Sequence, residues 1–323
     1  MARTRLYRDG VLEAEGFPIA EVSDRITDPA ATVWFDLCAP DADDLATLGE
    51  ELGLHSLAVE DVLQGPQRPK LDRYPSHMFV TCYAVRLDTD RGTLDMSEVN
   101  AFVTANAFVT VRRTDRFDID EVVARWDANP ELARHGVAFL LYGLLDYAVD
   151  TQFDAVESLD EQIENLEDQL FSDRPTAEDM QRRSFELRKS LVTLRRIVLP
   201  TRELVDSVRR RELHGYDEAM LPYFEDVYDH ALRAGEWTES LRDLVTTILD
   251  THLTLRSNRL NVVMKQVTSW AAIIAVPTAV TGFYGQNLPY PGYGRAAGFA
   301  TSTVVILAMS IGLYVVFRRK GWL

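Results

Sequence analysis

A stripe of small and weakly polar residues runs through an apolar segment near the C-terminus. In helical steps of three and four, one face carries Asn261, Met264, Val267, Ala271, Ala275, Thr278 and Gly282. None is charged, and Asn287 follows at the far end. A ring of carboxamide oxygens presents dipoles without fixed charge, which suits a cation that keeps its water shell, as Mg²⁺ tends to. Small-residue stripes are also typical of transmembrane helix packing. The pattern alone leaves both interpretations open, a pore lining and a packing face.

Two features favour the pore interpretation. The amides of Asn261 and Asn287 bracket the stripe. Asp250 lies eleven residues before Asn261, which places it close to the same face of a helix. A ring of acidic side chains there would concentrate cations at an inner mouth.

The stripe belongs to the first of two uncharged apolar runs, Val267 to Tyr284 and Ala296 to Phe317. Each approaches or exceeds the ~20 residues that cross a bilayer as a helix. Basic residues flank the runs on one side, whereas the connecting turn holds only Arg295; they are Arg256, Arg259, Lys265, Arg318, Arg319 and Lys320. The positive-inside rule therefore predicts two transmembrane helices in the plasma (inner) membrane, with both termini in the cytoplasm.

Composition limits the remaining function classes. The 323 residues include 50 Asp and Glu against 34 Lys and Arg, a net charge of −16. This balance argues against a nucleic-acid partner and supplies hard oxygen ligands for divalent cations. The mean hydropathy of −0.12 is too polar for a transporter with many spans. No phosphate-binding GxxxxGK[ST] loop and no nucleophile–base arrangement occurs, so neither a nucleotide nor an enzyme activity is expected.

The N-terminal part is predicted to be mixed α/β. Strands are expected at residues 32–37, 77–85, 98–103 and 107–112, and a helix at 41–54 with Asp41 as its N-cap. Asp36 and Asp44 are interpreted as turn and capping acids. Cys38 and Cys82 are expected to be free thiols in a reducing compartment.

Helices are predicted from residue 136 onward. Apolar spacing indicates helices at 137–170 and 177–208, packed as an antiparallel acidic pair. No clear breaker occurs between Tyr223 and Pro277, so one helix is predicted from Tyr223 to Tyr284, ~90 Å long at 1.5 Å per residue. Such a helix should be bundled with copies of itself.

Several sequence blocks resemble the CorA-type divalent-cation channels. Tyr284-Gly285-Gln286-Asn287 is similar to the family's Tyr-Gly-Met-Asn signature at the end of the first span. Residues 59–63 and 67–70 resemble its Leu-Glu-Asp-Ile-Leu…Gln-Arg-Pro-Lys block. Residues 222–230 resemble its Pro-Tyr-Phe-x-Asp-Val-Tyr-Asp-His block. The blocks occur in family order across essentially the whole chain.

The resemblance implies a funnel-shaped homopentamer: an α+β cytoplasmic domain, a long stalk helix and two C-terminal transmembrane helices. Gly285, Gln286 and Asn287 fall on the outer selectivity ring, and Asp250, Asn261, Met264, Val267 and Thr278 on pore-lining positions. Glu60, Asp61 and Asp226 match an intersubunit regulatory cation site, where bound Mg²⁺ would favour the closed state. The implied segments are 1–135 (α/β domain), 136–221 (helical pair), 222–284 (stalk and first span), 285–295 (external loop), 296–317 (second span) and 318–323 (basic tail).

The predicted function is a channel through which the membrane potential drives hydrated Mg²⁺ inward, with Co²⁺, Ni²⁺ or Zn²⁺ as further candidate ions. One alternative is a zinc transporter of the same superfamily; the absence of charged residues from both spans argues against proton coupling through the pore. A second alternative is a membrane-anchored cation sensor or scaffold that conducts nothing. Two departures bear on ion choice: Gln286 replaces the signature methionine, and residues 288–295 contain no carboxylate.

Overall fold

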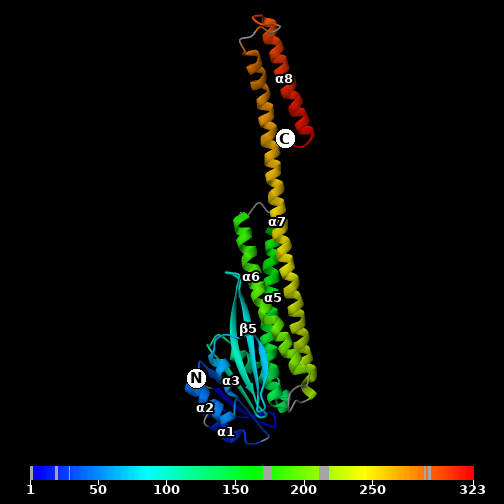
Figure 1. The fold of residues 1–323 in the computed structure, drawn as a ribbon. Helices are drawn as coiled ribbons and strands as arrows, with labels where there is room; N and C mark the ends of the chain where they lie inside the picture. The colour runs from blue at the N-terminus through cyan, green and yellow to red at the C-terminus, as the bar shows by residue number, and fades with distance from the viewer. Residues whose placement is uncertain are drawn as a thin grey trace. The chain divides into compact units, whose positions relative to one another are not determined.

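The computed structural model describes residues 3–18, 21–28, 30–169, 177–210, 218–286, 289 and 292–323. Packing divides the chain into two compact units, Met1–Thr247 and Ile248–Leu323. Figure 1 shows the elements of both units along the chain. The long helix α7 (Leu221–Tyr284) begins in the first unit and ends in the second.

The first unit is built on a seven-stranded sheet with the order β2-β1-β3-β7-β6-β5-β4. Only the β3–β7 pair is parallel. The strands are β1 (Arg3–Arg8), β2 (Val11–Glu15), β3 (Ala31–Cys38), β4 (Lys70–Arg73), β5 (Met78–Asp88), β6 (Thr93–Val103) and β7 (Ala107–Arg112). The four strands predicted from the sequence are confirmed.

Helices cover both faces of this sheet and enclose two cores. Trp34 and Phe35 are neighbours in β3, and because side chains alternate along a strand they enter opposite cores. One core contains residues of α1 (Val22–Arg25), α2 (Ala42–Leu52) and α3 (Ser56–Leu63). The other contains residues of α4 (Ile119–Ala128), the 3-10 helix η2 (Pro130–His135) and α5 (Val137–Gln169). The β3 strand is therefore buried on both faces, which explains its nearly continuous apolar run.

The capping prediction for α2 is confirmed, whereas the interpretation of Asp36 is wrong. Asp41 accepts a hydrogen bond from the backbone of Asp44, which completes a capping box. Asp36 lies inside β3 with no exposure, and its carboxylate forms an ion pair of 2.6 Å with Arg112. A buried carboxylate persists there because a cation and hydrogen bonds compensate its charge.

Long helices complete the first unit. The helix α6 (Ala177–Arg209) packs against α5 and continues through Pro200. The start of α7, preceded by η3 (Glu218–Met220), joins them through a ring contact of 5.5 Å between Phe153 and Trp237. An ion pair between Arg195 and Glu239 adds to this contact.

The second unit consists of the C-terminal part of α7 and the helix α8 (Ala296–Arg319). In the described part of the chain, these two helices are long and apolar enough to cross a membrane. Their large apolar side chains are mostly exposed, as for Phe299 at 77 % and Val304 at 64 %. Apolar surface of this extent is typical of contact with lipid or with another chain. The uninterrupted helix from Tyr223 to Tyr284 is confirmed.

Candidate functional site

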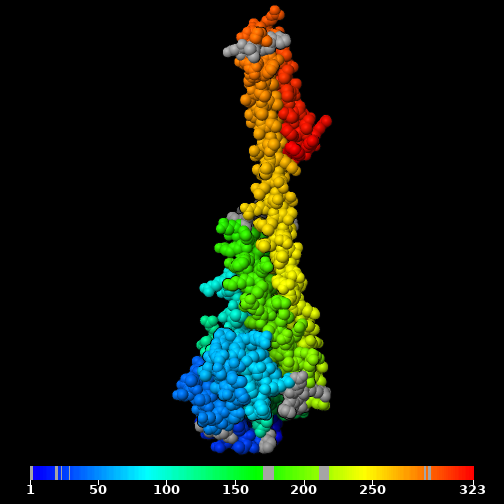
Figure 2. All heavy atoms as spheres, in the orientation of Figure 1, coloured from blue at the N-terminus to red at the C-terminus, as the bar shows by residue number. Residues whose placement is uncertain are grey.

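The helix α8 covers one side of α7, and the stripe lies on the other. Within the apolar span of α7, the buried and half-buried residues gather on one face of the helix: Ser269, Ala272, Ile273, Val276, Pro277, Val280 and Tyr284. A ring contact of 6.5 Å joins Trp270 to Tyr314 of α8. Figure 2 shows α8 (red) along one side of the C-terminal part of α7 (orange), with other α7 surface uncovered. Packing within the unit therefore uses a face distinct from the stripe.

All seven stripe residues from Asn261 to Gly282 are exposed. Met264 is 66 % and Val267 is 64 % exposed, and a Cβ added at Gly282 would meet no atom within 4 Å. The interpretation of the stripe as a packing face is thus wrong for the contact between α7 and α8. The neighbour of the stripe is then lipid, a second copy of the chain or an aqueous path.

Two polar side chains on α7, Thr278 within the stripe and Asp250 before it, are accessible to solutes. Thr278 donates its hydroxyl to the carbonyl of Ile274 at 3.2 Å, so its oxygen can still accept hydrogen bonds from water or a hydrated ion. Asp250 is exposed on the same helix. No ion pair of its carboxylate occurs among the described residues. Both groups are therefore free to meet solutes.

The signature residues at the end of α7 are placed only in part. Gly285 donates its backbone N–H to the carbonyl of Thr281 at 2.8 Å. A Cβ at Gly285 would lie 2.9 Å from that oxygen, so glycine is required for the helix to end in this way. Gln286 is exposed. Asn287 and loop residues 288, 290 and 291 lie outside the described residues.

The carboxylate of Asp61 on α3 is held by two partners, Gln67 in the segment before β4 and Lys70 at the start of β4. Lys70 approaches Oδ2 with its ammonium at 2.5 Å, and Gln67 donates Nε2 to Oδ1 at 2.9 Å. Partial burial opposes ionisation of Asp61, but these two bonds outweigh it and lower its pKa. Asp61 is therefore a partly exposed carboxylate that stays ionised near neutral pH and already pairs with a cationic group.

A polar network behind Asp61 fixes the position of Gln67. The backbone N–H of Gln67 donates to Glu98 at 3.2 Å, and its carbonyl accepts the hydroxyl of Tyr83. Arg113 donates to the carbonyl of Val62, which ties α3 to the same network at 2.7 Å. Sequence reasoning missed all of these partners. The only signal was the block of residues 67–70, noted for its resemblance without a physical role.

The other two predicted regulatory acids are exposed. Glu60 accepts a hydrogen bond from Gln64 one helical turn later. Asp226 lies on α7 with its side chain 65 % exposed, 3.5 Å from His230. Within the described residues, no group of three or more acidic, histidine or cysteine side chains could hold a metal ion. A site that uses Asp61 and Asp226 together must therefore draw ligands from more than one chain or from water.

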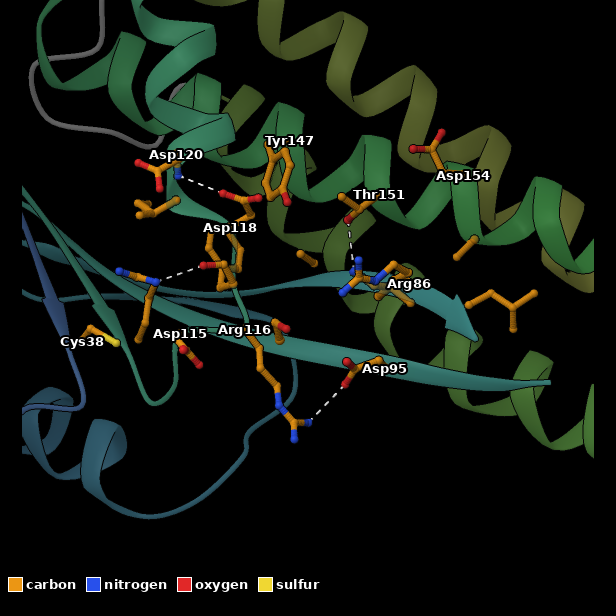
Figure 3. Close-up of a pocket in the computed structure, with 18 of the residues that line it drawn as sticks. Cys38, Arg86, Asp95, Asp115, Arg116, Asp118, Asp120, Tyr147, Thr151 and Asp154 are labelled. Atoms are coloured by element: carbon orange, nitrogen blue, oxygen red, sulfur yellow. Dashed lines mark hydrogen bonds and ion pairs between the residues drawn. The ribbon is translucent and has the colours of Figure 1, made fainter. Parts of the chain in front are cut away.

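A cavity of the first unit lies at a different place. It has a volume of about 850 Å³ and lies between α5, the β5–β6 hairpin and the start of α4. Figure 3 shows Arg116 directed at Asp95. A second ion pair joins Arg3 to Asp120. Much of its charge is thus neutralised by ion pairs within the chain. None of the predicted site residues lines it.

A stacked aromatic group beside α3 predicts a pH dependence. Tyr74 lies between His55 and His77, with ring centroids 4.6 and 4.9 Å away. Burial, and secondly the charge of His55, lower the pKa of His77 below its ordinary 6.5. The unfolded chain then takes up this proton more readily, so stability present above about pH 6.5 is lost as the pH falls.

We expect the thermal unfolding midpoint of the full-length protein to fall between about pH 7.5 and about pH 5.5. In His77→Phe the ring stack is kept without the proton site, and the fall should be smaller by roughly 2–4 °C. The midpoint is measured by circular dichroism at both pH values. An equal fall in both proteins would contradict this assignment.

Comparison with known proteins places the chain among metal-ion transporters. The family model described as "CorA-like Mg2+ transporter protein" matches residues 29–319. The "Cobalt/magnesium transport protein CorA" of Thermotoga maritima is 31 % identical over 299 residues, covering 92 % of this chain and 85 % of that protein. The "Zinc transport protein ZntB" of Yersinia enterocolitica is 23 % identical, with 82 % and 80 % covered.

A solved structure supports the fold over the full length. The complete structure of the CorA magnesium transporter from Methanocaldococcus jannaschii matches with a TM-score of 0.80 at 21 % identity. The match covers 100 % of this chain and 99 % of that one. The predicted fold class is thereby confirmed at the level of an α+β unit, a long helix and two apolar C-terminal helices.

Proposed function

The chain belongs to the CorA-like Mg²⁺ transporter family, and from this premise we propose that it is a channel that carries hydrated Mg²⁺ into the cytoplasm. The observation that carries the proposal is the exposed stripe on the face of α7 that α8 leaves free. Uncharged dipoles along such a face suit an ion that keeps its water shell. The driving force is the membrane potential acting on a double positive charge.

In the proposed assembly, five copies of α7 surround one axial path. Asp250 forms the inner mouth, Met264 and Val267 form an apolar constriction, and Gly285, Gln286 and Asn287 form the outer ring. Residues 1–135 and 136–221 lie in the cytoplasm and residues 285–295 outside, with the basic tail 318–323 back on the cytoplasmic side. The second span, 296–317, faces lipid.

Closure is proposed to depend on cytoplasmic Mg²⁺ held between neighbouring subunits by Glu60, Asp61 and Asp226. The donor set fits this ion, because Mg²⁺ prefers carboxylate and water oxygens. The ion pair of Asp61 with the ammonium of Lys70 supports this proposal, because the carboxylate is ionised and faces a positive charge in the folded chain. Bound Mg²⁺ would relieve the repulsion between subunits, and its loss would favour opening.

The proposal is tested by ion flux into liposomes that contain the purified protein. A negative-inside potential should drive Mg²⁺ entry, with or without a pH gradient, and empty liposomes give the background. Zn²⁺ entry that requires a proton gradient would instead favour zinc transport, for which the ZntB relative and Gln286 are the supporting observations. The absence of flux for both ions would favour a non-conducting sensor.

A further inference from the structure

Lys70 stands between two carboxylates, one of which is the proposed sensor. Its ammonium lies 2.5 Å from Asp61 of α3 and 2.7 Å from Asp72 of its own strand, β4. Because Lys70 and Asp72 are two residues apart in a strand, their side chains leave on the same face. The Lys70 side chain is 21 % exposed and its ammonium lies 5.5 Å from the ring centroid of Phe79. Lys70 is thus held within reach of both carboxylates.

We propose that Lys70 is a tethered competitor of the divalent cation at Asp61, and that it sets the cytoplasmic cation concentration at which the sensor fills. This inference rests on the proposed function, since it concerns the regulation of the same channel. A divalent cation that binds Asp61 displaces the ammonium, which then keeps Asp72 as its partner. Lys70 is a positioning and threshold-setting residue and need not touch the transported ion.

The geometry allows this exchange without unfolding. Asp61 uses one oxygen for Lys70 and the other for Gln67, and each carboxylate oxygen has a further lone pair. The Asp61 side chain is 23 % exposed, so a hydrated ion can reach it from solvent. Gln67 stays in place during the exchange, because Glu98 and Tyr83 hold its backbone.

The charges of the pair support competition. Burial would lower the pKa of Lys70, but its bonds to Asp61 and Asp72 outweigh burial and raise it. Both members of the pair therefore stay charged near neutral pH, and the ammonium cancels much of the field that Asp61 presents to a dication. A neutral side chain at position 70 restores that field.

The experiment digests the full-length protein in detergent with a protease at increasing Mg²⁺ concentrations. The threshold is the Mg²⁺ concentration that gives half of the maximal protection. Lys70→Met removes the charge and keeps an unbranched side chain beside Phe79, and Lys70→Gln is a second variant should Met disturb folding. Half-protection should need roughly twofold to fivefold less Mg²⁺, the factor expected for losing one partly exposed ion pair. Arg68→Met is the matched control: Arg68 is exposed and forms no ion pair among the described residues, so its threshold should not move.

Two further variants make the test specific to the pair. In an Asp61→Asn background, Lys70→Met should no longer change the threshold, because the shared carboxylate is gone. Asp72→Asn should raise the threshold in the wild type and have less effect once Lys70 is replaced, a coupling that a double-mutant cycle measures. Equal shifts in Arg68→Met and Lys70→Met, or a Lys70→Met shift that persists with Asp61→Asn, would overturn the inference.

The liposome flux assay separates this inference from the proposed function. If the protein carries Mg²⁺ but Lys70→Met leaves the threshold unchanged, the competitor role of Lys70 is wrong and the channel proposal stands. If the threshold shifts in a protein that carries no Mg²⁺, Lys70 is a competitor within a cation sensor and the channel proposal is wrong.

Discussion

Modification of Ala275→Cys with a positively charged thiol reagent is expected to abolish cation flux almost completely. Ala275 lies in the stripe, on the exposed face of α7. Because a helix turns by about 100° per residue, Ala275 shares one face with the other stripe residues. A bulky positive group attached there would therefore project into the proposed path. Repulsion and steric block act together, and we expect at least roughly a tenfold loss of Mg²⁺ entry, which corresponds to a barrier higher by about 1.4 kcal/mol.

Ile273→Cys is the matched control, because Ile273 is half-buried on the α7 face that α8 covers. The same reagent should leave its flux close to that of the untreated protein. The wild type must also be treated, since Cys38 is partly exposed whereas Cys82 is fully buried, with a raised thiol pKa. If modification at 273 blocked as strongly as at 275, the stripe would not be the path.

Much of the architecture could be predicted because the signals are local. The start of α2 was predicted from the capping residue Asp41, and the two apolar helices from uncharged runs longer than a globular helix requires. The continuity of α7 followed from the absence of a breaker before Pro277, and Pro277 itself lies within the helix. None of these predictions needs knowledge of distant contacts.

The missed elements depend on partners far along the chain. β4, with the sequence Lys-Leu-Asp-Arg, has no apolar alternation and becomes a strand only through its pairing with β5. β2 is an almost fully exposed edge strand, so it shows no burial pattern either. Asp36 was assigned to a turn because an isolated Asp is typical of turns. Its partner Arg112 follows 76 residues later on the neighbouring strand.

The candidate site shows the same division. The composition of the stripe was visible in the sequence, but the face that α8 covers was not, because both faces of the apolar span of α7 are uncharged. Asp61 was found through a resemblance, whereas its contact with Lys70 requires α3 and β4 to be folded against each other. Whether these residues regulate the protein is therefore a question for substitution at the acids themselves.

Asp226→Lys is expected to leave the channel open at cytoplasmic Mg²⁺ concentrations that close the wild type. The side chain is 65 % exposed and lies 3.5 Å from the ring of His230, so reversal of its charge should not disturb a core. A lysine repels a dication that Asp226 would attract and competes for the carboxylates of the neighbouring subunit. The inhibitory Mg²⁺ concentration should rise at least roughly tenfold, which corresponds to about 1.4 kcal/mol of lost binding.

The measurement is Mg²⁺ flux as a function of the Mg²⁺ concentration on the cytoplasmic side, compared with Glu225→Lys. Glu225 is also exposed on α7 and carries the same charge, but it points about 100° away around the helix. A general effect of surface charge would shift both variants equally, whereas a local binding site shifts only Asp226→Lys. The pKa of Asp146 is raised first by burial, then by the charge of Asp150, and to a smaller extent by the charge of Asp226. Asp226→Lys should therefore also lower the pKa of Asp146. If the Mg²⁺ concentration that stops flux were the same in Asp226→Lys as in the wild type, Asp226 would not belong to the sensor. The proposed cation path along α7 would be unaffected by that result.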